Sequence, residues 1–300
     1  MTFVKCMINI LVFMLLVTFN AFQVYAEEAT DQKTKSFLWE VTTDTSTVYI
    51  LGSIHFADAS FYPLNQTIEN AFKDSSTLVL ELNPLTVDEQ KMQAMVIEKG
   101  IYTGGETIVD HISPEVFTRL ERHLAENNMP VQGFLNMRPG MLSIALSTIQ
   151  LMKLGYSPTE GIDIYFARNA TNNKSIIELE TMEEQLSLIF DMPDENSMLK
   201  YTLQDLENVE KLFTSITAEW KNGDSVAMDN LLLKQFDTYP ELKPVIKKLF
   251  YDRNVKMTSK IQELMKANQK YFVVIGAGHL VGEKGILQLL KNEGYTIRQL

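Results

Sequence analysis

Two stretches near opposite ends of the chain, Thr47-Val-Tyr-Ile-Leu-Gly-Ser-Ile-His55 and Tyr271-Phe-Val-Val-Ile-Gly-Ala-Gly-His279, share one local pattern. Each begins with a run of β-branched, aromatic and aliphatic residues, which predicts a buried strand. Each then continues into Gly-x-x-His, where Gly52 and Gly276 permit a tight turn or a close approach to a ligand. Because ligands bind at the carboxyl ends of parallel strands, we expect these strands to be neighbours and their imidazoles to meet in one crevice.

The residues around these stretches alternate between strand and helix patterns. Further strands are expected at residues 37–41, 77–81, 175–179 and 295–299. Helical patterns dominate residues 102–155, and a single apolar stripe predicts one long helix over residues 194–220. The strand–turn–helix–strand order at the end of the chain predicts parallel pairing. We therefore expect one α/β domain over residues 37–300, with a mostly parallel central sheet and a large helical insertion or cap.

Composition and charge narrow the class of protein. The chain has 300 residues, of which 45% are hydrophobic and 22% charged, so a disordered or disulfide-scaffold protein is excluded. Its net charge is −11, and no run of Lys or Arg interrupts the acidic balance. An acidic surface repels phosphate, so we expect neither nucleic acid nor an anionic membrane surface as a partner.

The amino terminus has the pattern of an export signal. Lys5 precedes an apolar run at residues 7–22, and Val24-Tyr-Ala26 supplies a cleavage site. We predict a signal peptide over residues 1–26 and a polar leader over residues 27–36; an uncleaved membrane anchor is the alternative. Cleavage would remove the only cysteine, Cys6, and leave no membrane span. The protein is then expected in the periplasm or outside the cell.

A third expected strand end carries an acid. Glu81 closes the apolar strand at residues 77–81, and a buried carboxylate needs a metal ion, an arginine or a histidine as its partner. Together with His55 and His279 it makes a set of ligands that suits Zn²⁺, Mn²⁺, Co²⁺ or Fe²⁺. Taken singly, each histidine is equally compatible with a core or capping role.

Other polar residues are weaker candidates. Glu180 precedes an expected helix start, where capping or a buried ion pair competes with a catalytic role. Arg138 lies at a helix entrance, and Arg253 and Asn254 lie within a predicted helix. Either arginine is suited to neutralise a developing oxyanion. Asp163 is interpreted as a helix-start residue that favours the helix dipole.

The sequence resembles the TraB/GumN (PrgY, Tiki) family. The resemblance rests on the two Gly-x-x-His motifs and on intermediates in the family's order: Val79-Leu-Glu-Leu82, Arg138-Pro139, Gly161-Ile-Asp163, Leu179-Glu-Thr181 with Glu184-Gln185, and Arg253-Asn254. It implies an α/β fold akin to erythromycin esterase and ChaN-type proteins. It also implies metal-dependent proteolysis with Mn²⁺ or Co²⁺, as in the Tiki proteins, or inhibition of peptide pheromones. If the functional residues of the family are assigned to the matching positions of this chain, the site comprises His55, Glu81 and His279, with Arg253 and Glu180 nearby.

Two hypotheses of function follow. The first is a metal-dependent hydrolase, most simply a peptidase, in which the metal (Mn, Co or Zn) polarises the scissile carbonyl of a peptide or small-molecule substrate. Glu81 would be a ligand or general base, and Arg253 would stabilise the oxyanion; a variant without metal uses a histidine as the base, oriented by the glutamate. The alternative is a non-catalytic protein that sequesters a peptide or haem-like ligand. A third reading gives the histidines only a structural role.

Overall fold

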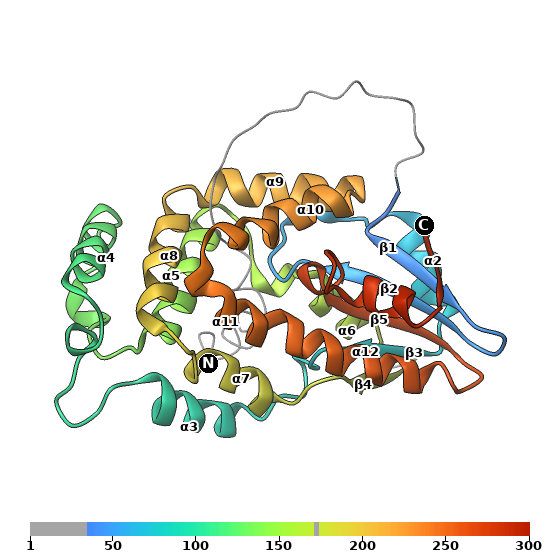
Figure 1. The fold of residues 1–300 in the computed structure, drawn as a ribbon, viewed down its shortest axis with the longest axis horizontal. Helices are drawn as coiled ribbons and strands as arrows, with labels where there is room; N and C mark the ends of the chain where they lie inside the picture. The colour runs from blue at the N-terminus through green and yellow to red at the C-terminus, as the bar shows by residue number, and fades with distance from the viewer. Residues whose placement is uncertain (1–34, 171–173) are drawn as a thin grey trace.

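The computed structural model describes residues 35–170 and 174–300, shown in colour in Figure 1. The predicted signal peptide over residues 1–26, and all but the last two residues of the polar leader, lie outside the described residues. Within the described ranges, no helix is both long enough and apolar enough to cross a membrane.

A mixed sheet organises the fold. Its strands are β1 (Leu38–Thr42), β2 (Thr47–Ser53), β3 (Thr77–Leu80), β4 (Ser175–Glu178), β5 (Lys270–Gly276) and β6 (Thr296–Gln299). They lie in the order β4-β3-β5-β2-β1-β6. The first four in this order pair in parallel, whereas β1 pairs antiparallel with both β2 and β6. The prediction of an α/β protein with a mostly parallel sheet is therefore confirmed.

The two Gly-x-x-His strands are direct neighbours, as expected. β2 and β5 pair in parallel along their whole length, and their buried aliphatic residues fill the centre of the sheet. In their register Gly52 lies opposite Ile275 and Ser53 opposite Gly276, so the two motifs are offset by one residue. Both histidines consequently leave the sheet at the same edge.

The end of the chain differs from the expected parallel pairing. β6 pairs with β1, not with β5, and the β1–β6 ladder is antiparallel. The strands β5 and β6 still run in the same direction, because β1 is antiparallel to both β2 and β6. The motif strand β5 is thus buried between β2 and β3, where two ladders satisfy its backbone groups.

The helices follow most of the predicted segments. They are α2 (Gln66–Asp74), α3 (Glu89–Gly100), α4 (Pro114–Glu126), α5 (Pro139–Lys153), α6 (Ile162–Ala170), α7 (Met182–Phe190), α8 (Glu195–Leu206), α9 (Val209–Asn222), α10 (Ser225–Leu232), α11 (Lys243–Ile246), α12 (Asp252–Leu264) and α13 (Ile286–Asn292). In Figure 1, α4, α5 and α8 gather at the end of the molecule away from the sheet. Most of the helical residues lie between β3 and β5 in the chain.

The single long helix predicted over residues 194–220 is wrong, because the chain breaks there into α8 and α9. The apolar stripe of this segment serves two different cores. Leu199, Leu203 and Leu206 belong to a core with α4 and α5, whereas Phe213 and Trp220 belong to the main core around the sheet. A straight helix would present all of these residues on one face.

A π-helical turn, Lys247–Tyr251, joins α11 to α12. The extra residue of such a turn re-aims the side chains that follow it, and π turns are frequent at functional sites. Arg253, in the first turn of α12, is directed back so that its Nη1 group donates a hydrogen bond to the carbonyl oxygen of Leu249, 3.1 Å away. The guanidinium is thereby turned into the protein, toward the ends of the strands.

Gly52 is required by packing. A methyl group on it would overlap the ring of Phe37 and lie 3.2 Å from the α-carbon of Ala277. Its carbonyl oxygen also accepts a hydrogen bond of 2.6 Å from the indole of Trp220. We expect Gly52→Ala to lower the free energy of unfolding by about 1–3 kcal/mol through overpacking, as measured by urea denaturation.

The matched control is Gly133→Ala. A methyl group at Gly133 meets no atom within 4 Å, so the same change in backbone entropy occurs without a clash. Equal stability of the two variants would contradict the packing argument.

Candidate functional site

Each of the four parallel strands contributes one side chain at its carboxyl end. Glu180 follows β4, Glu81 follows β3 directly, and His55 follows β2. His279 ends a 3₁₀ turn, Ala277–His279, that follows β5. All four side chains are buried, as is Arg253 from α12. The edge of the sheet that the sequence pointed to therefore carries a concentration of buried polar groups.

Arg253 is bonded to three of these side chains. Its Nε and Nη2 groups donate to the two carboxylate oxygens of Glu180, at 2.7 and 2.6 Å. Nη2 also donates to Oε2 of Glu81 at 2.7 Å, and Nη1 donates to Nε2 of His279 at 2.8 Å. With the bond to the carbonyl of Leu249, all five N–H groups of the guanidinium have an acceptor. We call Glu81, Glu180, Arg253 and His279 the arginine cluster.

The orientation of His279 is fixed from behind. Asn254, the neighbour of Arg253 on α12, donates from Nδ2 to the carbonyl oxygen of Lys284 at 2.8 Å. Its Oδ1 atom therefore faces His279 and accepts the hydrogen bond of 2.6 Å from Nδ1. The ring proton is thus on Nδ1, and the lone pair of Nε2 points at the guanidinium of Arg253.

His55 has a different environment. Its Nδ1 atom lies 2.7 Å from Oδ1 of Asp163, whereas its Nε2 atom is buried without a hydrogen-bond partner. A methyl group on Gly276 would lie 3.5 Å from this Nε2 and 3.3 Å from Oε1 of Glu81. We call the position that a methyl group on Gly276 would take the space above Gly276; an imidazole nitrogen without a partner and a carboxylate oxygen border it.

The electrostatics of the two histidines are opposite. Burial lowers the pKa of His55, but the charge and hydrogen bond of Asp163, with a contribution from Glu81, outweigh it and raise the pKa above its ordinary value. For His279, burial and the positive charge of Arg253 both act to lower the pKa, which lies well below the ordinary value. The surroundings of His279 therefore favour its neutral form, whereas those of His55 favour its protonated form.

The two glutamates also differ. Burial raises the pKa of Glu81. The positive charge of Arg253 lowers this pKa, but the negative charge of the neighbouring Glu180 raises it again, so the pKa stays above its ordinary value. For Glu180, the hydrogen bonds from Arg253 outweigh burial and lower the pKa. Between two carboxylates the guanidinium stays charged, and its own pKa is raised. Gln185 links the pair, because its Nε2 atom donates to Glu180 at 3.0 Å and to Glu81 at 3.3 Å.

The structure places the predicted site residues in two regions. It brings Glu81, Glu180, Arg253 and His279 together with Asn254 behind them, and sets His55 across Gly276. Arg138 lies elsewhere, beside Glu195 and Tyr102 at the entrance of α5.

Sequence reasoning missed the roles of two residues. Asp163 was interpreted as a helix-start residue, but its carboxylate bonds His55. Gln185 had no assigned role, although it bridges both glutamates. Both lie in segments on which the family resemblance rests, which is the signal that pointed to them.

The predicted metal ligands do not fit a metal ion in this arrangement. The lone pair of His279 Nε2 and Oε2 of Glu81 are both occupied by Arg253, and a guanidinium cation lies where the metal would have to bind. In the part of the chain that the structure describes, no three His, Cys, Asp or Glu side chains are grouped so as to hold a metal ion.

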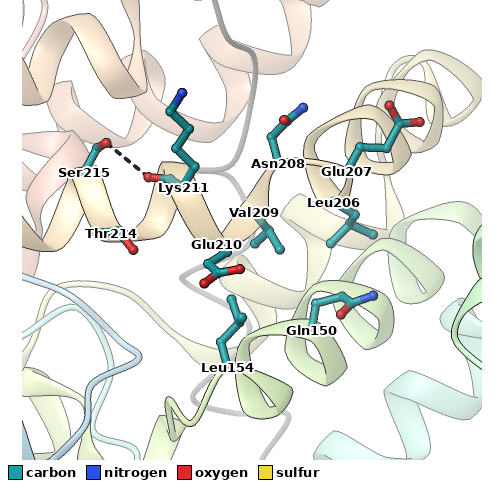
Figure 2. Close-up of a pocket in the computed structure, with 10 residues that line it drawn as sticks. All are labelled: Gln150, Leu154, Leu206, Glu207, Asn208, Val209, Glu210, Lys211, Thr214 and Ser215. Atoms are coloured by element: carbon teal, nitrogen blue, oxygen red, sulfur yellow. Dashed lines mark hydrogen bonds between the residues drawn. The ribbon is translucent and has the colours of Figure 1, made fainter.

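Two surface pockets in the described part of the chain lie outside this cluster. One, of about 540 Å³, is lined by residues of α5, of the end of α8 and of α9, among them Gln150, Leu206 and Glu210 (Figure 2). A second, of about 390 Å³, includes Tyr62, Tyr165 and Arg168. It lies beside the site, because α6 carries both Tyr165 and Asp163.

The contrast between the histidines can be measured by long-range ¹H–¹⁵N NMR. We expect His279 to remain the neutral Nδ1–H tautomer at pH values well below the usual histidine pKa, and His55 to titrate above the usual histidine pKa of about 6.5. In Asn254→Leu, which removes the acceptor, we expect His279 to lose the single tautomer. A protonated His279 in the wild-type protein at neutral pH would contradict the assignment.

Comparison with known proteins supplies relatives along most of the chain. This chain is 24% identical over 245 residues to the uncharacterized protein YbaP of Escherichia coli (strain K12). The match covers 81% of this chain and 87% of that protein. It is 22% identical to Metalloprotease TIKI1 of Danio rerio and to Metalloprotease TIKI2 of Xenopus tropicalis, in each case over 87% of this chain. The chain spans 62% and 59% of the length of these two metalloproteases.

No solved structure matches the chain, so the expected likeness to erythromycin esterase and ChaN-type proteins stays a prediction. The model of the TraB/PrgY/gumN family matches residues 37–299, which is nearly all of the described chain. The chain therefore belongs to the TraB/PrgY/gumN family.

Proposed function

We propose that this protein is a hydrolase, most simply a peptidase, that acts at the space above Gly276. The observation that carries the proposal is the buried Nε2 atom of His55, which has no hydrogen-bond partner although Nδ1 is bonded to Asp163 at 2.7 Å. A buried polar atom without a partner is rare and indicates a place for a ligand or a reacting group. The metalloprotease relatives, at 22% identity, support hydrolysis as the class of reaction.

His55 is suited to be the general base. Because Nδ1–H donates to Asp163, the neutral ring has its lone pair on Nε2, which faces the space beside Oε1 of Glu81. A water molecule in this space would give its proton to Nε2 while its oxygen attacks the scissile carbonyl carbon. When the C–N bond of the peptide breaks, the imidazolium returns that proton to the leaving amine.

Glu81 would position the water. Its Oε1 atom accepts a hydrogen bond of 2.7 Å from the backbone N–H of Gly276, and Oε2 is bonded to Arg253. This fixes the carboxylate while leaving it able to accept a second hydrogen bond at Oε1. The space above Gly276 would close if a side chain replaced the hydrogen.

Arg253 has a different role from the one expected. Since all five of its N–H groups donate within the protein, stabilisation of an oxyanion would require one of these bonds to break. We assign it to hold Glu81 in place and to neutralise the charge of two buried carboxylates.

The predicted cofactor, a divalent Mn, Co or Zn ion, has no part in this mechanism, because the residues present do not fit it while Arg253 occupies the cluster. Export to the periplasm or the extracellular space, on the signal-peptide pattern of residues 1–26, belongs to the same proposal. The substrate would then be a peptide or small molecule met outside the cytoplasm.

The direct test is hydrolysis of a peptide library by the purified protein, followed by mass spectrometry. We expect cleavage by the wild type and a decrease in kcat/KM of about 10²–10⁴-fold in His55→Gln, which removes the base. Gly276→Ala should also lose activity, because its methyl group takes the place of the water.

Two matched controls separate chemistry from folding. His111→Gln changes an exposed histidine that follows the 3₁₀ turn Ile108–Asp110, and Gly133→Ala adds a methyl group into open space; both should retain full activity. If peptides bind saturably but no product forms, and if the affinity is equal in the wild type and in His55→Gln, the result would favour a sequestering protein instead.

The pH profile tests the partnership of His55 with Asp163. The base must be neutral, so kcat/KM should rise with pH through a pKa above the ordinary histidine value, because Asp163 raises it. In Asp163→Asn the negative charge that raises the pKa of His55 is lost, while burial still lowers this pKa. The acidic limb of the kcat/KM profile should therefore move to lower pH.

The maximal rate of Asp163→Asn should fall by about 10²-fold or more, because the amide no longer fixes the productive tautomer. An acidic limb that stays in place, with only the maximal rate reduced, would assign the limb to another group.

A further inference from the structure

Ser53, the last residue of β2, is a second buried side chain whose polar atom has no hydrogen-bond partner. The residue is 1% exposed, and its Oγ atom is buried without a partner, as is Nε2 of His55. Buried polar atoms of this kind are rare, and here two of them are separated in the chain by Ile54 alone. The mechanism described above leaves this hydroxyl without a role.

The pairing of the strands fixes the face of the sheet on which this hydroxyl lies. Ser53 and Gly276 are register partners in the parallel ladder of β2 and β5. Side chains of register partners leave a sheet on the same face, because successive residues of each strand alternate between the two faces. A methyl group on Gly276 would lie 3.5 Å from Nε2 of His55 and 3.3 Å from Oε1 of Glu81. The side chain of Ser53 therefore lies on the face that carries the space above Gly276.

The other side-chain donors of the site are already used. All five N–H groups of Arg253 donate within the protein. Nδ2 of Asn254 donates to a backbone carbonyl, and Nε2 of Gln185 donates to two glutamates. The proposed hydrolase has a base and a group that positions the water, but it lacks a donor for the negative charge that develops on the scissile carbonyl oxygen. The hydroxyl of Ser53 is a donor that remains available.

We propose that Ser53 is a further catalytic residue, whose Oγ–H group donates a hydrogen bond to the oxyanion of the tetrahedral intermediate. The inference rests on the proposed function, because it uses the same water and the same base. When the water oxygen attacks the carbonyl carbon, the π electrons of the C=O bond move to the carbonyl oxygen, which Ser53 stabilises while keeping its own proton. The electron pair returns when the C–N bond breaks and His55 protonates the leaving amine.

The strand spacing suits this role. The Cβ atom of Ser53 lies about one strand spacing, about 4.8 Å, to the side of the position that the water takes above Gly276. A carbonyl group attacked by this water fits between the two, with its oxygen toward the hydroxyl. The water itself is held by His55 and Glu81 in the proposed mechanism, so donor and nucleophile approach the carbonyl from different strands.

The first test compares the wild type with Ser53→Ala on a peptide that the wild type cleaves. We expect kcat to fall by about 10²–10³-fold with KM little changed, because the lost hydrogen bond forms only as charge develops. The acidic limb of the pH profile should stay in place, because the base is unchanged. Ser53→Thr keeps a hydroxyl on the same carbon and should retain most of kcat.

Stability separates this role from a structural one. Ser53→Ala removes a buried hydroxyl that has no partner, so its melting temperature should equal or exceed that of the wild type. A structural role predicts the reverse combination, a lower melting temperature with unchanged kcat. The matched control is Tyr102→Phe, which removes another buried hydroxyl without a partner, in the core formed with α4 and α5. This control should retain full kcat.

Three results would overturn the inference, and they are distinguishable. Wild-type kcat in Ser53→Ala, together with lost activity in His55→Gln, would refute the role of Ser53 and leave the hydrolase standing. Covalent labelling of Ser53 by a fluorophosphonate, detected by intact-protein mass spectrometry, would make the residue a nucleophile instead of an oxyanion donor. Absence of any peptide cleavage by the wild type would refute the proposed hydrolase and this inference with it.

Discussion

The buried ion pair network of Arg253 with Glu81 and Glu180 is the constraint on which this structure depends. Two carboxylates at the ends of adjacent strands are tolerable inside a protein only with a cation between them. That cation, Arg253, lies on α12, 172 positions after Glu81 in the sequence. The network therefore connects two segments that are distant in the chain. The π-helical turn before α12 is the backbone feature that turns the guanidinium inward.

The two Gly-x-x-His motifs are similar in sequence and different in chemistry. His279 faces a guanidinium and is held as a neutral acceptor, whereas His55 faces a carboxylate and retains a free nitrogen. The one-residue offset between β2 and β5 is consistent with this asymmetry, because it places Gly276 beside His55. One motif therefore supplies a proton acceptor and the other completes the surroundings of an arginine.

Much of the framework was predictable from local patterns. The strand pattern of each Gly-x-x-His motif, the β1–β2 hairpin and the capping box at Thr181 are each encoded within a few residues. What local patterns lacked was the identity of distant partners. The stripe at residues 194–220 does not reveal that it faces two cores, and Asp163 fits a helix start equally well whether or not it also reaches His55, 108 positions away.

The break between α8 and α9 has a consequence for how this protein can vary. The second core, formed with α4 and α5, contains none of the side chains of the arginine cluster, which all extend from the sheet edge and α12. The helices α5 and α8 contribute side chains to both cores, so a volume change in the outlying core reaches the main core through these two helices. The face of α4 is the part of this lobe that contributes only to the outlying core, so substitutions there lie furthest, in terms of packing, from the charged interior at the strand ends.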